Sequence, residues 1–253
     1  MKMHLLSGGR LRMKRKVYIS DAADDEMIDL PVLCFLLRHP QGNVLFDTGC
    51  HPDAATHAEG RWGGMSKMMK LVSPADENLI AGLGALGVSV DDIDLVVNSH
   101  FHTDHCGCNA FFRKATVVCH ARELEAASAP DAAKAGFLDA DWKHPNRFDT
   151  IDTQRDVYGD GRVVLVPLPG HTAGTIGALI ALERSGRFLL ASDAVALRAN
   201  LDRDDCPRQT WSPELAHRSM TEIRRIEASG ATVVFGHDLA QWETLRKGSQ
   251  CYD

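Results

Sequence analysis

The 253-residue sequence has no excess of basic residues and no long hydrophobic run. Its 28 Lys and Arg are outnumbered by 34 Asp and Glu, which gives a formal net charge of −6. A nucleic-acid backbone or an anionic membrane would gain little attraction from such a chain, so neither is expected as a partner. No stretch approaches the roughly 20 apolar residues of a membrane-spanning helix, and residues 1–16 lack the apolar core of a secretion signal. These absences favour chemistry on a small-molecule substrate.

Paired cysteines and flexible linkers are also missing. The seven cysteines lie at scattered positions, so free thiols in a reducing compartment are expected, and we predict a cytoplasmic protein. Cys106 and Cys108 form a lone Cys-x-Cys pair, which packing explains more simply than metal binding. No Gly-, Ser- or Pro-rich segment divides the chain, so a single domain over residues 1–253 is predicted.

The sequence does contain an alternation of strand-like and helix-like segments. Segments 31–37 and 43–49 flank a Pro-Gln-Gly turn and predict a hairpin. Helices are predicted from Ser73 to Gly87 and from Ser212 to Gly230, because each begins with Ser-Pro and closes with Gly. A third helix is predicted over 121–127.

The other predicted strands cover residues 93–100, 115–120, 162–171, 175–183, 187–193 and 232–238. Residues 128–160 have weak periodicity and are predicted to form a long loop with partial helix. The basic run from Arg10 to Lys16 is expected to be a solvated strand face. This order of elements suggests an α/β fold in which two sheets pack face to face and helices cover them.

Histidines and aspartates concentrate where the predicted strands end. A His-x-His-x-Asp-His pattern occupies residues 100–105, and three further candidates each follow an apolar run. Side chains at the ends of rigid strands are positioned accurately, and imidazoles interleaved with carboxylate can hold two divalent cations side by side. We therefore predict a two-metal site built from His100, His102, Asp104, His105, His171, Asp193 and His237. Gly170 and Gly236 each precede a candidate and are expected where the backbone must approach closely.

These motifs, together with Asp47-Thr48-Gly49 after an apolar strand, resemble the metallo-β-lactamase superfamily over residues 31 to about 252. The resemblance implies an αββα sandwich of two mixed sheets with the metals at one edge. Segment 30–32, the stretch from Ser99 to Asn109 and the closing Gly-His-Asp look most like the N-acyl homoserine lactonases and the related pyridoxolactonases. In that pattern one ion is held by His100, His102 and His171, the other by Asp104, His105 and His237, and Asp193 bridges them.

The resemblance implies a hydrolase that opens a cyclic ester, a lactone. Two divalent ions, most simply Zn²⁺, would share a water whose pKa falls toward ~7, and the resulting hydroxide would attack the carbonyl carbon. Asp104 is predicted to be catalytic, because it would move a proton to the leaving oxygen. The expected partner is a small-molecule substrate, and a homodimer is compatible with the sequence.

Several points leave the identity of the substrate undecided. The homoserine lactonases usually have a tyrosine three residues after the bridging aspartate, where this chain has Ala196, so either another group replaces that donor or the substrate differs. The same metal pair would serve another ester, a thioester, an amide or a phosphotriester, and the superfamily also contains iron-dependent redox enzymes. Apolar side chains of undecided role, in the pocket or in the core, are Trp62, Met65, Met68, Met69, Trp142, Phe148 and Trp211.

Overall fold

Two β-sheets pack face to face in the computed structural model, which describes residues 1–74 and 76–253. The larger sheet contains, in spatial order, β4 (Met69–Leu71), β1 (Lys2–Lys14), β2 (Met27–His39), β3 (Gly42–Phe46), β5 (Leu95–Val97), β6 (Thr116–His120) and β7 (Phe148–Ile151). The smaller sheet contains β12 (Thr232–Phe235), β11 (Gly186–Ser192), β10 (Ile176–Leu182), β9 (Val163–Pro167) and β8 (Arg155–Asp156). Both sheets mix parallel and antiparallel pairs.

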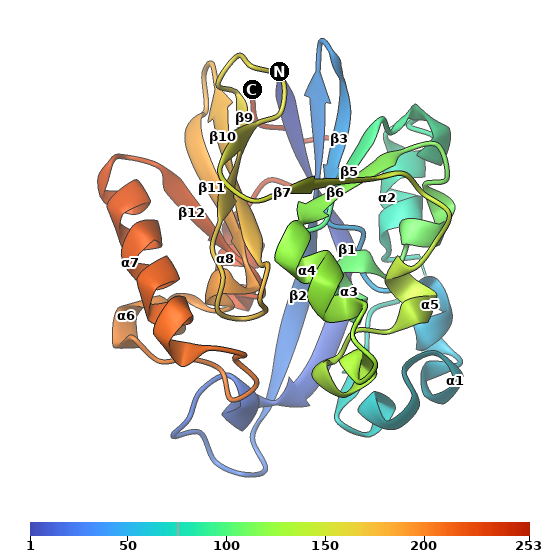
Figure 1. Cartoon of the computed structure of the whole chain (residues 1–253), viewed down its shortest axis with the longest axis vertical. Helices are drawn as coiled ribbons and strands as arrows, with labels where there is room; N and C mark the ends of the chain where they lie inside the picture. Colours follow the sequence, from blue (N-terminus) through green and yellow to red (C-terminus); the bar gives the residue numbers. More distant parts are fainter. Residues whose placement is uncertain (75) are drawn as a thin grey trace.

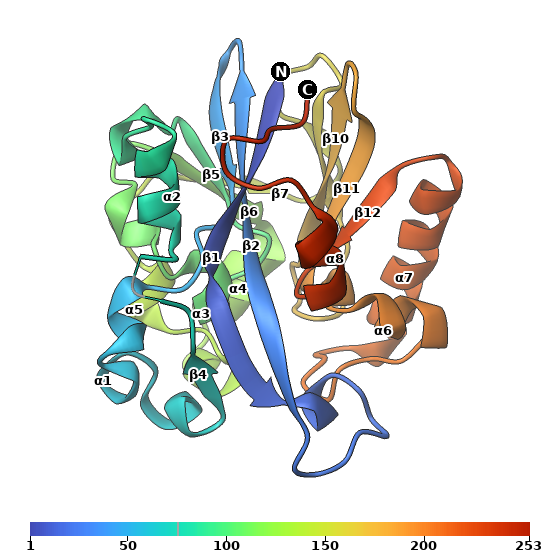
Figure 2. The ribbon, with the colours of Figure 1, turned by 180° about the vertical axis from the view of Figure 1, so that it is seen from behind.

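Helices cover the outer faces of both sheets (Figure 1). On one side α6 (Arg198–Arg203) and α7 (Pro213–Ala228) lie outside the smaller sheet, and on the other α2 (Leu79–Ala85) and α4 (Ala121–Ala127) lie outside the larger one. The shorter helices are α1 (Ala58–Trp62), α3 (Thr103–Cys106), α5 (Asp139–Trp142) and α8 (Leu239–Thr244). Figure 2 shows the long strands β1 and β2 running through the height of the molecule, with α8 beside them. This αββα order confirms the predicted fold class.

Apolar side chains from both sheets meet in one layer between them. Phe35 and Phe46 of the larger sheet share this buried cluster with Leu165, Ile180 and Phe188 of the smaller one. Burying apolar area of this kind is the main favourable term in folding. The two sheets therefore act as one rigid support for the loops at their edges.

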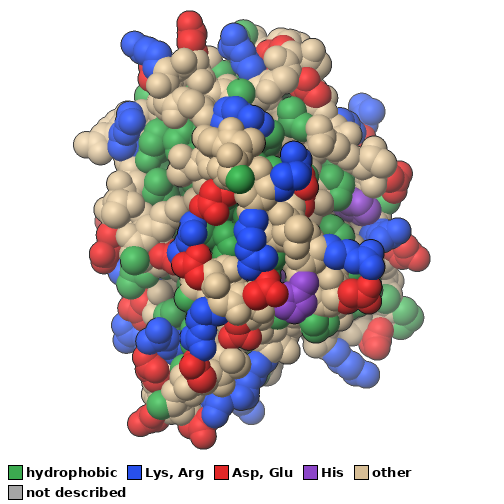
Figure 3. Space-filling view, turned by 90° about the vertical axis from the view of Figure 1, so that its left-hand side faces the viewer, with side chains coloured by type: hydrophobic (Ala, Val, Ile, Leu, Met, Phe, Trp, Pro, Cys, Tyr) green, Lys and Arg blue, Asp and Glu red, His purple; other side chains and the backbone are tan. Residues whose placement is uncertain are grey.

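Helix α7 shows how the outer layers are specified by local sequence. Ser212 caps the helix by accepting the Leu215 N–H, and Pro213 stands in the first turn, as predicted. Its apolar face, which includes Met220 and Ile223, is buried against the smaller sheet. The surface on this side of the molecule mixes acidic and basic side chains (Figure 3), so no single sign of charge dominates this face.

The hairpin of β2 and β3 and helix α4 confirm the prediction, whereas the helix predicted from Ser73 begins later. Helix α2 starts at Leu79, and Asn78 caps it by accepting the Ala81 N–H. The predicted start of this helix was wrong, because its buried positions, Leu79 and Leu83, lie only in the later part of the predicted span. Residue 75, inside the predicted span, lies outside the described residues.

The segment 128–160 is more regular than the predicted loop. It contains a 3-10 turn at Ala132–Ala135, helix α5, and the strands β7 and β8, which extend different sheets. These strands are short and partly exposed at sheet edges, so the sequence contains no run of alternating apolar residues that would predict them. Pairing with β6 and β9 defines them instead. Within the described part of the chain, no helix has the length and apolar character needed to cross a membrane.

Candidate metal centre

The seven predicted ligands come together at one edge of the two sheets. His100 follows β5, His171 follows β9, Asp193 directly follows β11 and His237 follows β12, so both sheets contribute. Helix α3 begins just after His102 and carries Asp104 and His105 on its first turn. All are buried except His102, which is partly exposed. Residues up to 137 positions apart in sequence, from His100 to His237, therefore meet in a single cluster.

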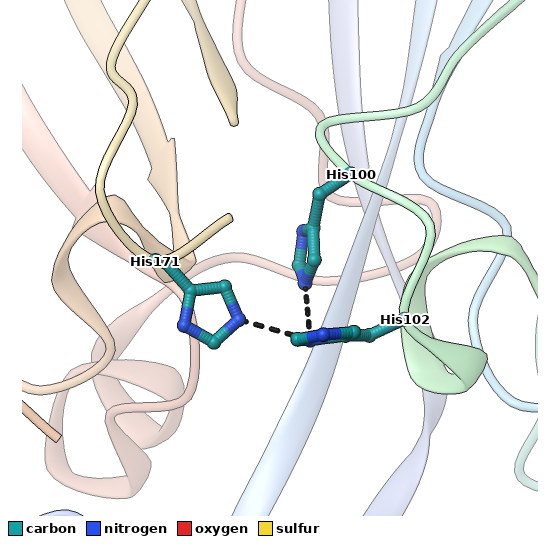
Figure 4. A group of neighbouring side chains, drawn as sticks. All are labelled: His100, His102 and His171. Atoms are coloured by element: carbon teal, nitrogen blue, oxygen red, sulfur yellow. Dashed lines mark hydrogen bonds between the residues drawn. The ribbon is translucent and has the colours of Figure 1, made fainter. Parts of the chain in front are cut away.

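Three imidazole nitrogens converge on one point (Figure 4). His100 Nε2 lies 3.1 Å from His102 Nδ1, and His171 Nε2 lies 3.0 Å from the same atom. A tetrahedral zinc ion with bonds of about 2.0–2.1 Å would hold its nitrogens about 3.3–3.4 Å apart. The observed spacing is close to that value, so this trio suits a first metal ion.

A second group of donors lies beside the first. Asp104 Oδ2 is 3.5 Å from the Nε2 atoms of both His105 and His237. Asp193 faces both groups, because its Oδ1 is 3.0 Å from His237 Nε2 while its Oδ2 is 3.4 Å from His171 Nε2. A carboxylate whose two oxygens point to two donor sets has the orientation of a bridging ligand.

Hydrogen bonds on the far side of three of the rings set which nitrogen faces the cluster. The carbonyl oxygens of Ala135 and Pro31 can only accept, so His102 Nε2 and His237 Nδ1 each donate a proton, at 3.0 and 2.9 Å. His105 Nδ1 likewise lies 2.8 Å from Asp47 Oδ2. The other nitrogen of each ring then turns a lone pair inward, as metal-binding histidines do.

His100, in the first trio, shows the same inward orientation as His102. Ser99 Oγ donates to Asp47 Oδ2 at 2.7 Å, which leaves it to accept from His100 Nδ1 at 3.0 Å. His100 Nε2 and His102 Nδ1 therefore face one another as two lone pairs, an arrangement that no shared hydrogen bond satisfies.

Several inward-facing atoms are buried without a hydrogen bond to the described residues. They are His105 Nε2, His237 Nε2 and Asp193 Oδ1. Facing acceptors in a buried site require either protons or a cation between them. Nitrogen and carboxylate donors of this kind match Zn²⁺ and similar divalent ions, so the residues present fit two metal ions.

Electrostatics supports the same interpretation. Burial, and then the neighbouring imidazoles, lowers the pKa of His100 well below its usual value. Burial also lowers the pKa of His171 to about 3, although Asp193 opposes this shift. Burial would also lower the pKa of His105, but Asp104, Asp193 and Asp47 outweigh it and raise that pKa. The carboxylates thus favour positive charge at this position. A divalent cation that binds here displaces protons from the ligands and supplies that charge.

Close backbone approach is confirmed at the two glycines that precede candidate ligands. A Cβ on Gly236 would lie 2.4 Å from Asp193 Oδ1, and a Cβ on Gly170 would lie 2.4 Å from the backbone N of Ala216. Gly170 also has a φ of +142°. Side chains at either position would therefore push a candidate ligand or its loop out of place.

Asp47 supports the cluster from behind, a role that sequence reasoning did not assign to the Asp-Thr-Gly element. Besides His105 Nδ1, its carboxylate accepts the backbone N–H and the hydroxyl of Ser99, both at 2.7 Å. It thus orients one candidate ligand and the residue next to another. Only the position of Asp47 directly after β3 could have suggested this role.

We expect Asp47→Asn to weaken metal binding by roughly tenfold to a hundredfold, the usual cost of losing a partner behind a metal-binding histidine. Competition with a chromophoric chelator measures the change. Asp94→Asn is the control, because Asp94 is exposed just before β5; this variant should bind metal like the wild type. Equal affinities in the two variants would show that Asp47 does not support the ligands.

Glu123 ties the two ligand-bearing loops together and was also missed. It is fully buried on α4, and its carboxylate accepts the Phe101 N–H at 2.9 Å. The other oxygen accepts the Thr172 hydroxyl at 2.7 Å and the Gly174 N–H at 2.9 Å. Burial outweighs these donors and raises the pKa of Glu123 to about 7. No motif marks this residue, because its partners lie in loops 22 and 51 positions away.

Because the folded chain holds the Glu123 proton more tightly than the unfolded chain, the free energy of unfolding should fall as the pH rises from about 4.5 to about 7. The contribution amounts to up to about 3 kcal/mol. Glu123→Gln should remove that part of the pH dependence, whereas Glu125→Gln, exposed on the same helix, should retain it. Denaturant unfolding with excess zinc at several pH values tests this. Parallel pH profiles for both variants would contradict the assignment.

A pocket of about 470 Å³ opens onto the cluster. Asp104, Asp193 and His171 lie in its wall, and the rest of the lining is largely apolar, including Leu11 and Met13 of β1. A mostly apolar cavity with a few polar groups in its wall is typical of a small-molecule site.

The apolar side chains of undecided role divide between the pocket and the core. Met65, Met68, Met69 and Trp211 line the pocket, and Met68 and Trp211 are largely exposed at its rim. Trp62 is buried in the core instead. Trp142 stacks on Phe101 and packs with Phe148 behind the metal ligands.

The thiols of Cys106 and Cys108 are turned to backbone oxygens. Cys106 Sγ donates to His102 O and Cys108 Sγ to Cys50 O, both at 3.3 Å. Both side chains are fully buried, and burial raises the pKa of each thiol. This confirms the packing interpretation for the pair.

Comparisons with known proteins agree with this geometry. Residues 27–237 match the Metallo-beta-lactamase superfamily. The chain is 33% identical to the N-acyl homoserine lactonase AttM of Azorhizobium caulinodans, covering 100% of this chain and 98% of that protein. It is 30% identical to the N-acyl homoserine lactonase AiiB of Agrobacterium fabrum, with 98% and 97% covered.

A solved structure is also similar. It is an N-acyl homoserine lactone hydrolase with the product N-hexanoyl-L-homoserine bound at its catalytic metal centre. It superposes with a TM-score of 0.89 at 25% identity, covering 100% of this chain and 98% of the other. Sequence, fold and the clustered donors agree, and the chain belongs to the metallo-β-lactamase superfamily.

Proposed function

We propose that this protein is a hydrolase with two divalent metal ions that opens lactones, with N-acyl homoserine lactones as the favoured class. The observation that carries the proposal is the orientation of Asp193, whose two oxygens face two separate donor groups at the floor of a largely apolar pocket. The similar proteins named above are lactonases, and the similarity covers nearly their whole length, which supports the substrate class.

In this proposal the chain's donors divide into two sets. One ion would be held by His100, His102 and His171, the other by Asp104, His105 and His237, and Asp193 would contact both. When bound, two such ions polarise a carbonyl and lower the pKa of water toward ~7. Zn²⁺ is the favoured ion, because imidazole and carboxylate donors in compact sets suit it.

The chain's own residues hold the substrate and move the proton. The apolar lining, with Leu11, Met13 and Met65, would bury the acyl chain and leave the ring at the polar end of the pocket. Asp104 stands at that end and would take a proton from the attacking water and deliver it to the leaving oxygen. The partly enclosed pocket would keep bulk water away from the reacting ring.

Two further expectations belong to the proposal. All seven cysteines are free, which supports the cytoplasm as the compartment, and one domain over residues 1–253 is supported by the apolar layer that both sheets share. A homodimer remains an expectation, which the molar mass measured by light scattering would test.

A proton-release assay tests the function directly, since opening a lactone produces an acid. N-acyl homoserine lactones with short and long acyl chains should turn over faster than an aromatic lactone, a linear ester, a thioester, an amide and a phosphotriester. Metal analysis should find two zinc ions per chain. Faster turnover of any non-lactone would overturn the substrate class, and one iron per chain would favour redox chemistry instead.

A further inference from the structure

A buried tyrosine that sequence reasoning did not consider lies in the wall of the metal pocket. Tyr18 follows the 3-10 turn Arg15–Val17 after β1, and its side chain is only 4% exposed. It lines the same pocket as Asp104 and Asp193. Its ring and the His237 imidazole form a T-shaped contact at a centroid distance of 6.2 Å. A phenol therefore stands next to the proposed second metal ion.

The Tyr18 hydroxyl donates its proton only to a weak acceptor among the described residues. Its hydrogen-bond partner among the described residues is Met13 Sδ at 3.9 Å, and a thioether is a weak acceptor. Buried tyrosines usually find a strong partner for this proton. A tyrosine hydroxyl has an ordinary pKa of about 10, so it keeps its proton at neutral pH.

Tyr18 occupies the region beside the position where the sequence lacks a hydroxyl. Ala196 is buried in the same apolar cluster as Tyr18, and its carbonyl oxygen accepts the His237 N–H at 2.8 Å. The methyl side chain of Ala196 offers no hydrogen bond. Two residues 178 positions apart thus both contact His237, Ala196 through its carbonyl oxygen and Tyr18 through its ring, and Tyr18 is the one of the two with a hydroxyl.

Tyr18 is also held firmly in place. Asn200 of α6 is fully buried and donates from Nδ2 to the Tyr18 carbonyl oxygen at 2.8 Å. Asn200 Oδ1 accepts the Leu197 N–H at 3.0 Å, which links Tyr18 to the segment that follows Asp193. A donor fixed in this way needs little reorganisation when charge develops near it.

We propose that Tyr18 is a catalytic residue that donates a hydrogen bond to the carbonyl oxygen of the bound substrate. This role rests on the proposed lactone hydrolysis. The bond strengthens as that oxygen gains negative charge, so Tyr18 lowers the barrier more than it tightens substrate binding. It supplies, from the segment after the first strand, the hydroxyl that position 196 does not have.

The test is Tyr18→Phe, which removes the hydroxyl and keeps the ring. The variant should bind two metal ions per chain, retain a KM within about twofold of the wild type, and lose roughly tenfold to a hundredfold in kcat, the usual effect of a hydrogen bond to a charged oxygen. Tyr158→Phe is the matched control, because Tyr158 donates to Gly42 O at 2.9 Å and packs on His39. It should keep the wild-type kcat.

Unchanged kcat in Tyr18→Phe with full metal content would overturn the role of Tyr18 while leaving lactone hydrolysis intact. Failure of the wild-type, metal-loaded enzyme to open any lactone would instead overturn both proposals. A crystal structure of the wild type with the ring-opened product gives a second test that needs no variant. It should place Tyr18 Oη within about 3 Å of a product carboxylate oxygen, and a separation beyond hydrogen-bond reach would contradict the proposal.

Discussion

Dialysis against a chelator is expected to lower the rate of lactone opening by more than about a thousandfold, and zinc should restore it. The reason lies in the donor set, because His105 Nε2, His237 Nε2 and Asp193 Oδ1 are buried without a hydrogen bond to any described residue, and a divalent cation would satisfy all three. Loss of a single oxyanion-stabilising group already costs roughly a hundredfold to a thousandfold, and both polarisation of the carbonyl and activation of water would disappear together.

The same treatment should lower thermal stability. Metal bound at about a thousand times its dissociation constant stabilises the fold by roughly 4 kcal/mol, which corresponds to a melting temperature about 10 °C higher for a chain of this size. Chelator already saturated with zinc is the control and should change neither activity nor melting temperature. Full activity in a sample shown by mass spectrometry to contain no metal would refute the two-metal site.

The second large effect is expected for Asp104→Asn. Burial alone would raise the pKa of Asp104, but the facing His105 and His237 lower it to about 2, so the group is a carboxylate at neutral pH. Asparagine has nearly the same shape but cannot accept the proton. Loss of general acid–base assistance costs roughly a hundredfold to ten-thousandfold in kcat, and we expect a loss in that range.

Metal content decides how this result is interpreted. If Asp104→Asn keeps both ions and loses kcat, the proton-transfer role is supported. If it keeps both ions and full turnover, that role is wrong. Asp139→Asn is the matched control, because Asp139 is exposed and pairs with Lys143 on the surface. It should behave like the wild type.

Local sequence patterns predicted much of the fold. The turn between β2 and β3, the Ser-Pro start and glycine end of α7, and the apolar runs of β9 to β11 are signals carried by neighbouring residues. Helix α2 and the strands β7 and β8 were predicted less well, since caps and edge pairings that depend on other segments define them.

The sequence by itself determined which side chains gather at the sheet edge. Four of them, including His100 and His237, end short apolar runs, the other three follow His100 in its hexapeptide, and strand ends converge when sheets pack. Tertiary structure alone decided what surrounds them. Asp47, Glu123 and Tyr18 meet their partners across 58, 51 and 219 positions of chain. Contacts at such separations arise only when the layers pack, so the spacing of residues along the chain does not predict them.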